Sequence, residues 1–284
     1  MTLCFTREDL DTPAAQYMRN IKTPVNYAQK EEVSKSELRG GMNFAFAGSG
    51  VLDVSFSPFP LKMQVDKFRE QIEQNVYTKI DLENSVALVS YTGNDYMYKT
   101  KKGGGTLKDV FDLTKTVVDL LTKNLREIRD LGVQKIAIFG TPPRGCFPDY
   151  YIELLQSCDE TWNEASRWHN KLLEESLQDL NKESNGSKFV YLDLYNAFIS
   201  ALFNKNKGTT GYEDRFKACC QGGPMECFSF ALAKKKCDHP ELSIFWDGAH
   251  PSQYGANAGE FANSDMVESK QQQTCQMDYP NKSP

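Results

Sequence analysis

The sequence predicts an α/β fold in which a parallel sheet is covered by helices on both faces. Three short runs are apolar along almost their whole length, as strands buried on both faces are, and they occupy 85–90, 135–139 and 188–192. Segments with helical periodicity lie between and after these runs. Because parallel neighbours in a sheet are joined through crossover helices, this alternation favours a parallel sheet with helices on its faces.

Composition places the chain among soluble globular proteins. Its 284 residues are 40% hydrophobic and 25% charged, with a formal net charge of −5. This balance gives no reason to expect nucleic acid or an anionic membrane as a partner. No apolar run approaches the roughly 18 residues of a membrane-spanning helix, so no span is expected. The first residues, MTLCFTREDLDTP, contain no apolar core of a secretory signal.

The first half of the chain begins with about forty polar and charged residues that show no clear period. The run NFAFA, Asn43–Ala47, predicts a short strand that is broken by the glycines which follow it. Prolines at 58 and 60 exclude a helix directly after this turn. Apolar residues at near-helical spacing predict a helix over 63–75, and SVALVS at 85–90 predicts a buried strand.

The second half carries the most regular helical pattern. Apolar residues recur at spacings of three and four from Leu107 to Leu131, and Gly132 stands where a helix C-cap favours glycine. The remaining predicted elements are a strand at 135–139, a helix at 161–180, a strand at 188–192 and one or two helical turns at 196–203. After Gly255 the chain becomes polar, so a poorly ordered tail is expected.

Small and polar residues follow the predicted strands, where ligands of parallel sheets gather. Gly48-Ser49-Gly50 follows NFAFA, and Thr92-Gly93-Asn94-Asp95 follows SVALVSY. Small residues let backbone N–H groups approach a ligand, and an asparagine amide adds an aimed donor. Together they have the parts of an oxyanion hole, which stabilises the charge on an attacked ester carbonyl.

Asp247 and His250 supply a candidate base. They stand three residues apart in SIFWDGAHPSQYG, in a chain with only three histidines. A carboxylate that accepts the imidazole Nδ1–H fixes the tautomer and leaves Nε2 able to take a proton. Taken alone, Asp247 is equally well explained as a helix cap, whereas Asn94 and Gly48-Ser49-Gly50 are better explained as turn residues.

Other motifs have weaker functional interpretations. The eight cysteines form no CxxC pair, so disulfides that staple a long loop are favoured over zinc. No metal or cofactor is expected. The Gly/Lys run from Lys101 to Gly105 suggests a phosphate loop, but no GK[ST] closes it. His169 lies within a predicted helix and is expected to be structural, whereas His239 lies in a Cys/Pro loop and is expected to be a loop residue.

In combination, these motifs resemble the plant GDSL esterase/lipase family of the SGNH hydrolase superfamily. The matching stretches are GMNFAFAGSGVLD, ALVSYTGNDY, KIAIFGTPPRGCFP, YNAF, KACC and FWDGAHPSQYG, in the family's order and spacing. They define a domain over residues 16–255, with an unmatched segment at 1–15 and a polar tail at 256–284.

The resemblance implies roles for specific residues. Gly48 and Asn94 would be oxyanion-hole donors, His250 the general base and Asp247 its orienting carboxylate. The implied fold is a flavodoxin-like three-layer α/β/α sandwich. The implied substrate is a small-molecule or lipid ester, and no cofactor is needed. The family is secreted and carries disulfides, of which Cys146 with Cys158 would be one, with others in the 219–237 group.

The sequence departs from the family's pattern at its front end. The family's nucleophile is the serine of a GDS block, and no GDS triplet occurs in these residues. We therefore expect the first strand to be missing and the chain to be weakly active or inactive. Ser49 is the nearest substitute, but Ala47 stands where the first glycine of a nucleophile elbow belongs, and prolines follow instead of a helix. A non-catalytic binding protein or a non-functional homologue is the alternative.

Overall fold

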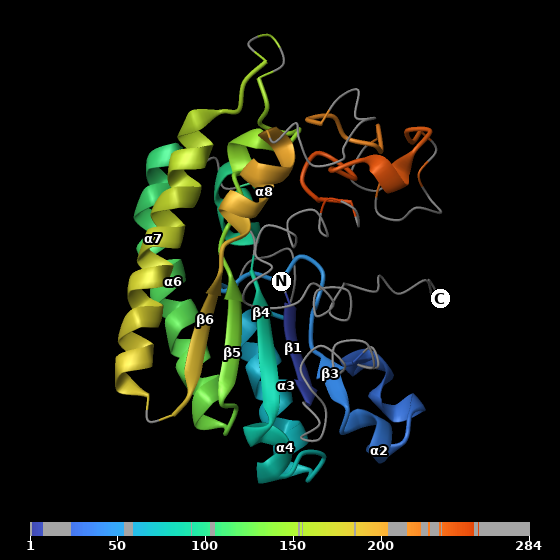
Figure 1. Cartoon of the computed structure of the whole chain (residues 1–284), viewed down its shortest axis with the longest axis vertical. Helices are drawn as coiled ribbons and strands as arrows, with labels where there is room; N and C mark the ends of the chain where they lie inside the picture. The colour runs from blue at the N-terminus through green and yellow to red at the C-terminus, as the bar shows by residue number, and fades with distance from the viewer. Residues whose placement is uncertain are drawn as a thin grey trace. The chain divides into compact units, whose positions relative to one another are not determined.

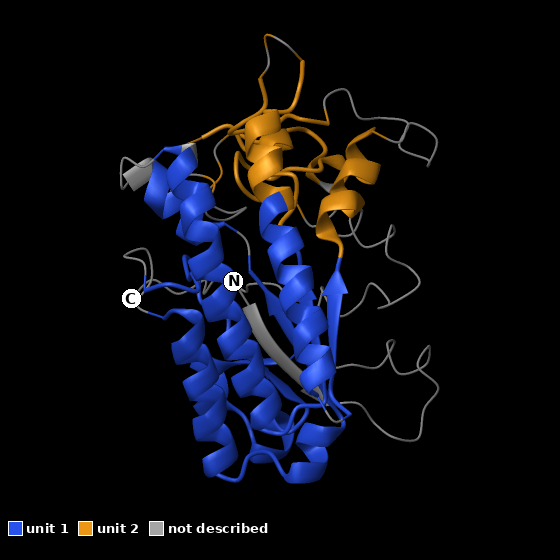
Figure 2. Cartoon of the chain, turned by 90° about the vertical axis from the view of Figure 1, so that its left-hand side faces the viewer, with its two compact units in different colours: residues 1–140, 168–192, 270–284 blue, residues 141–167, 193–269 orange. Residues whose placement is uncertain are grey.

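The computed structural model describes residues 2–7, 24–53, 59–91, 93–102, 106–152, 154, 156–184, 186–203, 215–222, 227, 233, 235–252 and 255; of these, residues 2–7, 101, 102, 107 and 241 are described for their backbone only. The chain forms two compact units, which Figure 2 distinguishes by colour. Unit 1 comprises residues 1–140, 168–192 and 270–284, and unit 2 comprises residues 141–167 and 193–269. The predicted tail at 256–284 lies outside the described residues.

Unit 1 is built on a six-stranded sheet with the order β2-β3-β1-β4-β5-β6 (Figure 1). The strands are β1 Thr2–Arg7, β2 Val25–Asn26, β3 Gly41–Asn43, β4 Ser85–Ser90, β5 Lys135–Phe139 and β6 Lys188–Leu192. β4, β5 and β6 pair in parallel, as do β2 and β3. The three strands that the sequence predicts are therefore confirmed with their bounds, in a mixed α/β arrangement consistent with an α/β/α fold. The expected burial holds for β4 and β5, whereas Val190 and Tyr191 of β6 are only partly buried.

β1 differs from the sequence-based expectation of a sheet that lacks its first strand. It pairs antiparallel with β3 on one side and with β4 on the other. The other five strands consequently share one direction, and β1 alone opposes them. The facing edges of β3 and β4 would otherwise present unpaired N–H and C=O groups, which a six-residue strand satisfies. The six residues are too few for a period to stand out within the polar segment at 1–40.

The predicted strand at NFAFA is shorter than expected. β3 ends at Asn43, whose buried side-chain oxygen accepts a hydrogen bond from the Ala45 N–H at 2.9 Å. This side-chain bond satisfies a main-chain donor locally, so the chain leaves the sheet there instead of continuing to Ala47.

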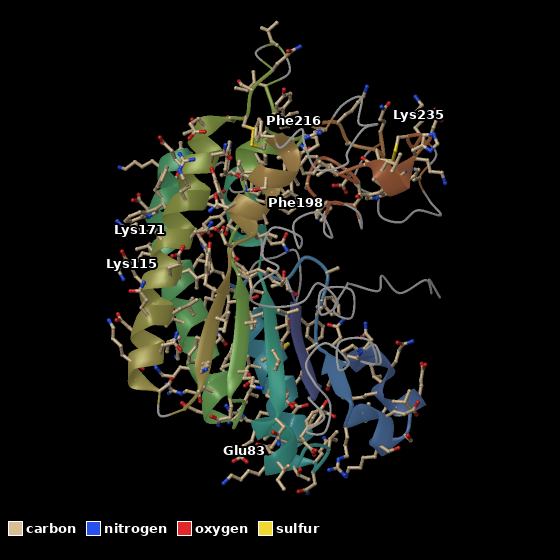
Figure 3. All side chains as sticks on the ribbon, viewed as in Figure 1. Glu83, Lys115, Lys171, Phe198, Phe216 and Lys235 are labelled. Carbon is tan, nitrogen blue, oxygen red and sulfur yellow. A yellow bond between two sulfur atoms is a disulfide. The ribbon has the colours of Figure 1, made fainter. Side chains whose placement is uncertain are left out.

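The long helices follow their predicted positions closely. They are α3 Leu61–Glu73, α6 Leu107–Asp130 and α7 Glu160–Glu183, of which α7 contributes residues from Trp168 onward to unit 1. Shorter helices in unit 1 are α2 Lys35–Leu38, α4 Lys79–Glu83 and α5 Asn94–Met97, with a short 3₁₀ helix η1 Tyr27–Glu32 and a single turn η2 Tyr98–Lys102. Gly132 ends α6 at a φ of +111°, as its position predicts. Lys115 and Lys171 extend from the exposed sides of α6 and α7 (Figure 3).

Unit 2 holds α8 Leu194–Phe203, two single turns, η3 Arg144–Cys146 and η5 Pro240–Leu242, and the start of α7. Its core joins Cys146, Phe147, Phe198, Leu202, Ile244 and Phe245, with Phe216 packed against it (Figure 3). Three disulfides cross-link this unit: Cys146–Cys158, Cys219–Cys237 and Cys220–Cys227. The expected pairing of Cys146 with Cys158, and of cysteines within 219–237, is thus present.

Candidate active site

Gly48 lies in a tight turn of unit 1 shortly after β3. The Ser49 N–H donates to the Phe46 carbonyl at 3.2 Å, and Gly48 has a φ of +75°. This left-handed conformation favours glycine because a Cβ would be strained there. Among the described residues, the Gly48 N–H has no hydrogen-bond acceptor. It is therefore a donor that a ligand could use.

Asn94 belongs to the segment that follows β4. Gly93, with a φ of +81°, turns the chain into α5, and Asn94 is the first residue of that helix. Its side-chain Nδ2 donates to the Ser49 carbonyl at 2.7 Å. This bond uses one of the two N–H groups of the amide, and the other has no acceptor within the described residues, so a ligand could use it. The structure thus joins the segments that carry Gly48 and Asn94, because β3 and β4 end at the same edge of the sheet.

Ser49 does not have the surroundings of a nucleophile. Its side chain is buried, and its hydroxyl donates to the Phe59 carbonyl at 2.7 Å. An activated serine needs an exposed oxygen and a base within hydrogen-bond reach. The Ser49 hydroxyl instead fixes the turn to the residues before α3.

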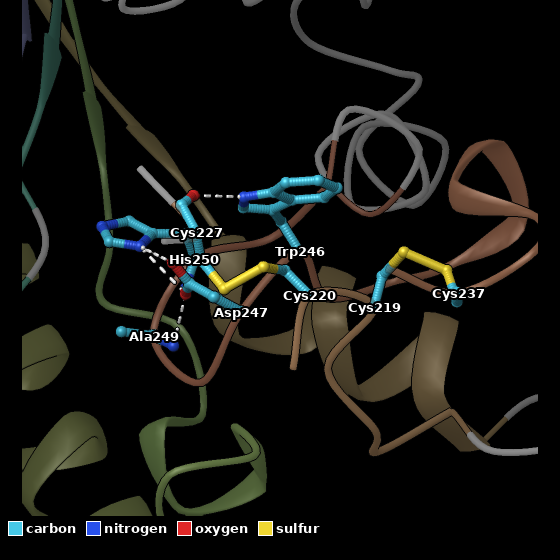
Figure 4. The surroundings of a disulfide bond; sticks show 8 residues. All are labelled: Cys219, Cys220, Cys227, Cys237, Trp246, Asp247, Ala249 and His250. Carbon is cyan, nitrogen blue, oxygen red and sulfur yellow. Dashed lines mark hydrogen bonds and ion pairs between the residues drawn. A yellow bond between two sulfur atoms is a disulfide. The ribbon is translucent and has the colours of Figure 1, made fainter. Parts of the chain in front are cut away.

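Asp247 and His250 form a hydrogen-bonded pair on a loop of unit 2 (Figure 4). The imidazole Nδ1 lies 3.0 Å from Asp247 Oδ1 and 2.9 Å from Oδ2. The same carboxylate accepts the backbone N–H groups of Ala249 at 2.8 Å and His250 at 2.7 Å. The His250 side chain is 55% exposed, whereas that of Asp247 is only 18% exposed. The imidazole of His250 thus faces solvent, while the Asp247 carboxylate is held by main-chain N–H groups of the same loop.

The electrostatics of this pair favour an ionised carboxylate. Burial alone would raise the pKa of Asp247, but the hydrogen bond and charge of His250 and the N–H groups of Ala249 and His250 outweigh it. The pKa of Asp247 therefore lies below its ordinary value. An anionic acceptor orients the Nδ1–H and leaves Nε2 as the proton-accepting nitrogen.

Neighbouring main-chain and indole bonds hold the loop that carries the pair. The loop closes on itself through Trp246 N–H to the His250 carbonyl at 2.9 Å. The Trp246 carbonyl accepts from the Cys220 N–H at 2.6 Å, and the indole Nε1 donates to the Cys227 carbonyl at 2.7 Å (Figure 4). Trp246 thus ties the Asp247–His250 loop to the Cys220–Cys227 disulfide, a contact that sequence reasoning missed.

Arg144 supports the same loop from another side. Its guanidinium is buried over the rings of Phe147 and Tyr150 and donates to the Ala249 carbonyl at 3.2 Å. Sequence reasoning gives this arginine no role. Its buried hydrogen bond to the Ala249 carbonyl fixes one point of a loop that has little regular structure.

The other two histidines have different surroundings. His169 is 1% exposed in unit 1, and its Nδ1 lies 2.8 Å from the Tyr96 hydroxyl. Burial lowers its pKa from 6.5 to about 4, so it is neutral at physiological pH. His239 is exposed in the loop before η5. The burial of His169 within its helix agrees with a structural role, and His239 lies in a loop, as the sequence predicts.

No group of three or more His, Cys, Asp or Glu residues within the described part of the chain could hold a metal ion. No helix in that part is long and apolar enough to cross a membrane. Lys101 and Lys102 end the single turn η2, and Gly103 to Gly105 of the considered phosphate loop lie outside the described residues.

Comparisons with known proteins identify a family and several relatives. The profile of the family described as GDSL-like Lipase/Acylhydrolase matches residues 10–258. The chain is 38% identical over 246 residues to GDSL esterase/lipase At5g03610 of Arabidopsis thaliana, covering 83% of this chain and 68% of that protein. It is 35% identical over 254 residues to GDSL esterase/lipase At3g09930 of the same plant, covering 85% of this chain and 71% of the relative.

Proposed function

Because this chain belongs to the GDSL-like lipase/acylhydrolase family, it is by family a hydrolase of ester bonds, and we propose that His250 is the general base of that reaction. The observation that carries this assignment is the Asp247–His250 pair, with an exposed imidazole and a carboxylate of lowered pKa. A general base contributes about 10²–10⁴-fold to such reactions.

Gly48 and Asn94 are the proposed oxyanion donors. The Gly48 N–H and the second N–H of the Asn94 amide would donate hydrogen bonds to the ester carbonyl oxygen as it gains negative charge. Main-chain groups of Ser49 hold both donors. The Ser49 N–H closes the turn that contains Gly48, and the Ser49 carbonyl accepts a hydrogen bond from the Asn94 amide. Donors held in advance stabilise the oxyanion without reorganisation during the reaction.

The proposed reaction of these 284 residues uses water in place of a serine. They contain no GDS triplet, and the Ser49 hydroxyl is buried against the Phe59 carbonyl. His250 Nε2 takes a proton from water as the water oxygen bonds to the ester carbonyl carbon. The carbon–alkoxide bond then breaks, and the same proton passes to the departing alcohol. We expect weak turnover, because without an activated serine no acyl-enzyme forms to divide the reaction into two easier steps.

The proposed substrate is a small-molecule or lipid carboxylic ester, and the proposed location is extracellular. Three disulfides in unit 2 support the location, since such bonds persist in oxidising compartments. No cofactor takes part in the steps proposed for these residues.

Turnover of p-nitrophenyl acetate and butyrate tests the assignment of His250. His250→Ala should lower kcat/KM by about 100-fold, because the proton acceptor is removed. His239→Ala provides the matched control, since it removes an exposed histidine from another loop of unit 2, and it should leave kcat/KM unchanged.

Equal turnover by the wild type and His250→Ala would contradict the proposal. Binding of these esters with no turnover would instead favour the second candidate, a non-catalytic ligand-binding homologue. The observation that favours this second candidate is the absence of a GDS triplet from these residues.

A further inference from the structure

A buried carboxylate in unit 1 holds the segment that carries the proposed oxyanion donor. Asp95 is 1% exposed, and its two oxygens accept the N–H groups of Leu52 at 2.8 Å and Val51 at 3.1 Å. The Tyr91 hydroxyl donates to the same carboxylate. Burial raises the pKa of Asp95, while these three donors act in the opposite direction.

The main chain at Gly50 packs directly against the Asp95 carboxylate. A Cβ placed on Gly50 would lie 2.4 Å from Asp95 Oδ1, nearer than real Cβ atoms approach a neighbour. Only a residue without a side chain allows the main chain to pass so close to the acid. Asp95 therefore packs against Gly50, which follows Ser49, and accepts hydrogen bonds from the N–H groups of the next two residues, Val51 and Leu52.

Asp95 and its neighbour Asn94 hold the same stretch of chain at different points. Asn94 Nδ2 donates to the Ser49 carbonyl at 2.7 Å, while Asp95 accepts from Val51 and Leu52. Both residues lie in the first turn of α5. A helix and a turn that are joined on both sides of Gly50 cannot shift independently, so the direction of the Gly48 N–H is tied to that of the Asn94 amide.

We propose that Asp95 is a positioning residue which fixes the turn at 48–52 on α5 and thereby sets the geometry of the two oxyanion donors. This inference rests on the proposed function of Gly48 and Asn94. Its physical basis is the number of acceptors: a carboxylate can accept at both oxygens, whereas an amide at this position would turn an NH₂ group toward one of the N–H donors. Hydrogen bonds to a charged acceptor are also stronger than those to a neutral one.

Asp95→Asn, with Asp81→Asn as a matched control, tests the proposal. Asp81 is an equally buried carboxylate of unit 1 that accepts from Thr78 and Arg39 in the cap of α4, away from the turn. Backbone amide exchange measured by NMR should accelerate about tenfold or more at Val51 and Leu52 in Asp95→Asn, relative to the rest of unit 1. Asp81→Asn should leave the relative exchange of these two amides unchanged.

Ester turnover supplies the functional readout. Asp95→Asn should lower kcat by about tenfold to hundredfold with little change in KM, because misplaced donors weaken binding of the oxyanion and not of the ground-state ester. Asp81→Asn should keep the kcat of the wild type. Tyr91→Phe removes one donor to the carboxylate and retains the carboxylate itself. It should accelerate amide exchange at Val51 and Leu52 and lower kcat, each by a smaller factor than Asp95→Asn does. This variant replaces Asp95→Asn if Asp95→Asn does not fold.

The possible outcomes separate this inference from the proposed function. Unchanged relative exchange at Val51 and Leu52, or accelerated exchange with an unchanged kcat, would overturn the role of Asp95. If ester turnover by the wild type is absent, or is the same in His250→Ala, the proposed function fails. The amide-exchange rates of Val51 and Leu52 then decide by themselves whether Asp95 holds the turn.

Discussion

At the scale of single residues, two histidines of this chain show how burial and hydrogen-bond partners determine the behaviour of an imidazole. His250 is exposed, and its Nδ1 is held by a carboxylate. His169 is buried, with Tyr96 on Nδ1 and no partner within the described residues on Nε2. The first arrangement keeps a proton acceptor in contact with solvent, whereas the second keeps an imidazole neutral.

The depressed pKa of His169 predicts a pH dependence of stability. Below pH 6.5 the unfolded chain binds a proton at this residue, while the folded chain does so only below about pH 4. Protonation of His169 should therefore lower the free energy of unfolding by about 3 kcal/mol as the pH drops from 6.5 to about 4. Below about pH 4 His169 should cause no further loss. Urea unfolding of the wild type and His169→Gln between pH 7 and 4 measures the difference.

His169→Gln should show a shallower loss of stability in this window than the wild type, whatever its stability at pH 7. His239→Gln is the control and should keep the wild-type slope. Asp247, whose stabilising effect is lost as the pH falls through its lowered pKa, is present in all three proteins and does not affect the comparison. Parallel curves for the wild type and His169→Gln would contradict the account.

The residue contacts that sequence predicts are the local ones. The pairing of Asp247 with His250 follows from a separation of three residues within one short loop. The contacts of Asp95 with Val51 and Leu52 span more than forty residues, and Trp246 reaches Cys227 across nineteen. No local pattern encodes these long-range bonds, because they depend on which strands become neighbours in the sheet and which cysteines pair.

At the scale of secondary-structure elements, α6 shows how short signals set the ends of a helix. Thr106 caps its N-terminus: the Thr106 hydroxyl and the Asp109 carboxylate each accept a backbone N–H of the other residue. Gly132 follows its C-cap. The apolar stripe between these ends includes Val117, Leu121 and Leu125, which are fully buried.

Replacement of the cap should weaken α6 measurably. Thr106→Ala should lower the free energy of unfolding by about 1 kcal/mol, because an N-terminal N–H loses its acceptor. Thr122→Ala, on the same helix, removes a hydroxyl that only bonds back to the Val118 carbonyl, and it should change stability by less than about 0.5 kcal/mol. Chemical denaturation of both variants makes the comparison. Equal losses would show that the cap does not stabilise α6.

The elements that sequence predicts are those with a long or fully apolar pattern. β4, β5 and β6 have the predicted bounds, and α6 differs from its prediction by one residue. β1 was not predicted, since the place of a six-residue strand between two others is decided by pairing and not by its own period. β3 is shorter than predicted because the Asn43 side chain competes for a main-chain donor.

At the scale of the whole molecule, the sequence predicts the α/β class and the family but not the division into two units. Each unit is assembled from segments that are separated along the chain, so no linker marks a boundary. Unit 1 is organised by its sheet, and unit 2 by an aromatic core and three disulfides. The proposed oxyanion donors belong to the first, and the Asp247–His250 pair to the second.

The central claim is that these residues carry the base and the oxyanion donors of an ester hydrolase without an activated serine. Incubation with a fluorophosphonate probe, followed by intact-mass measurement, tests it most directly, because the probe forms a covalent bond with an activated serine. The account predicts no stoichiometric adduct under conditions in which His250-dependent turnover of p-nitrophenyl butyrate is measurable. One adduct per chain, located on any serine, would contradict it.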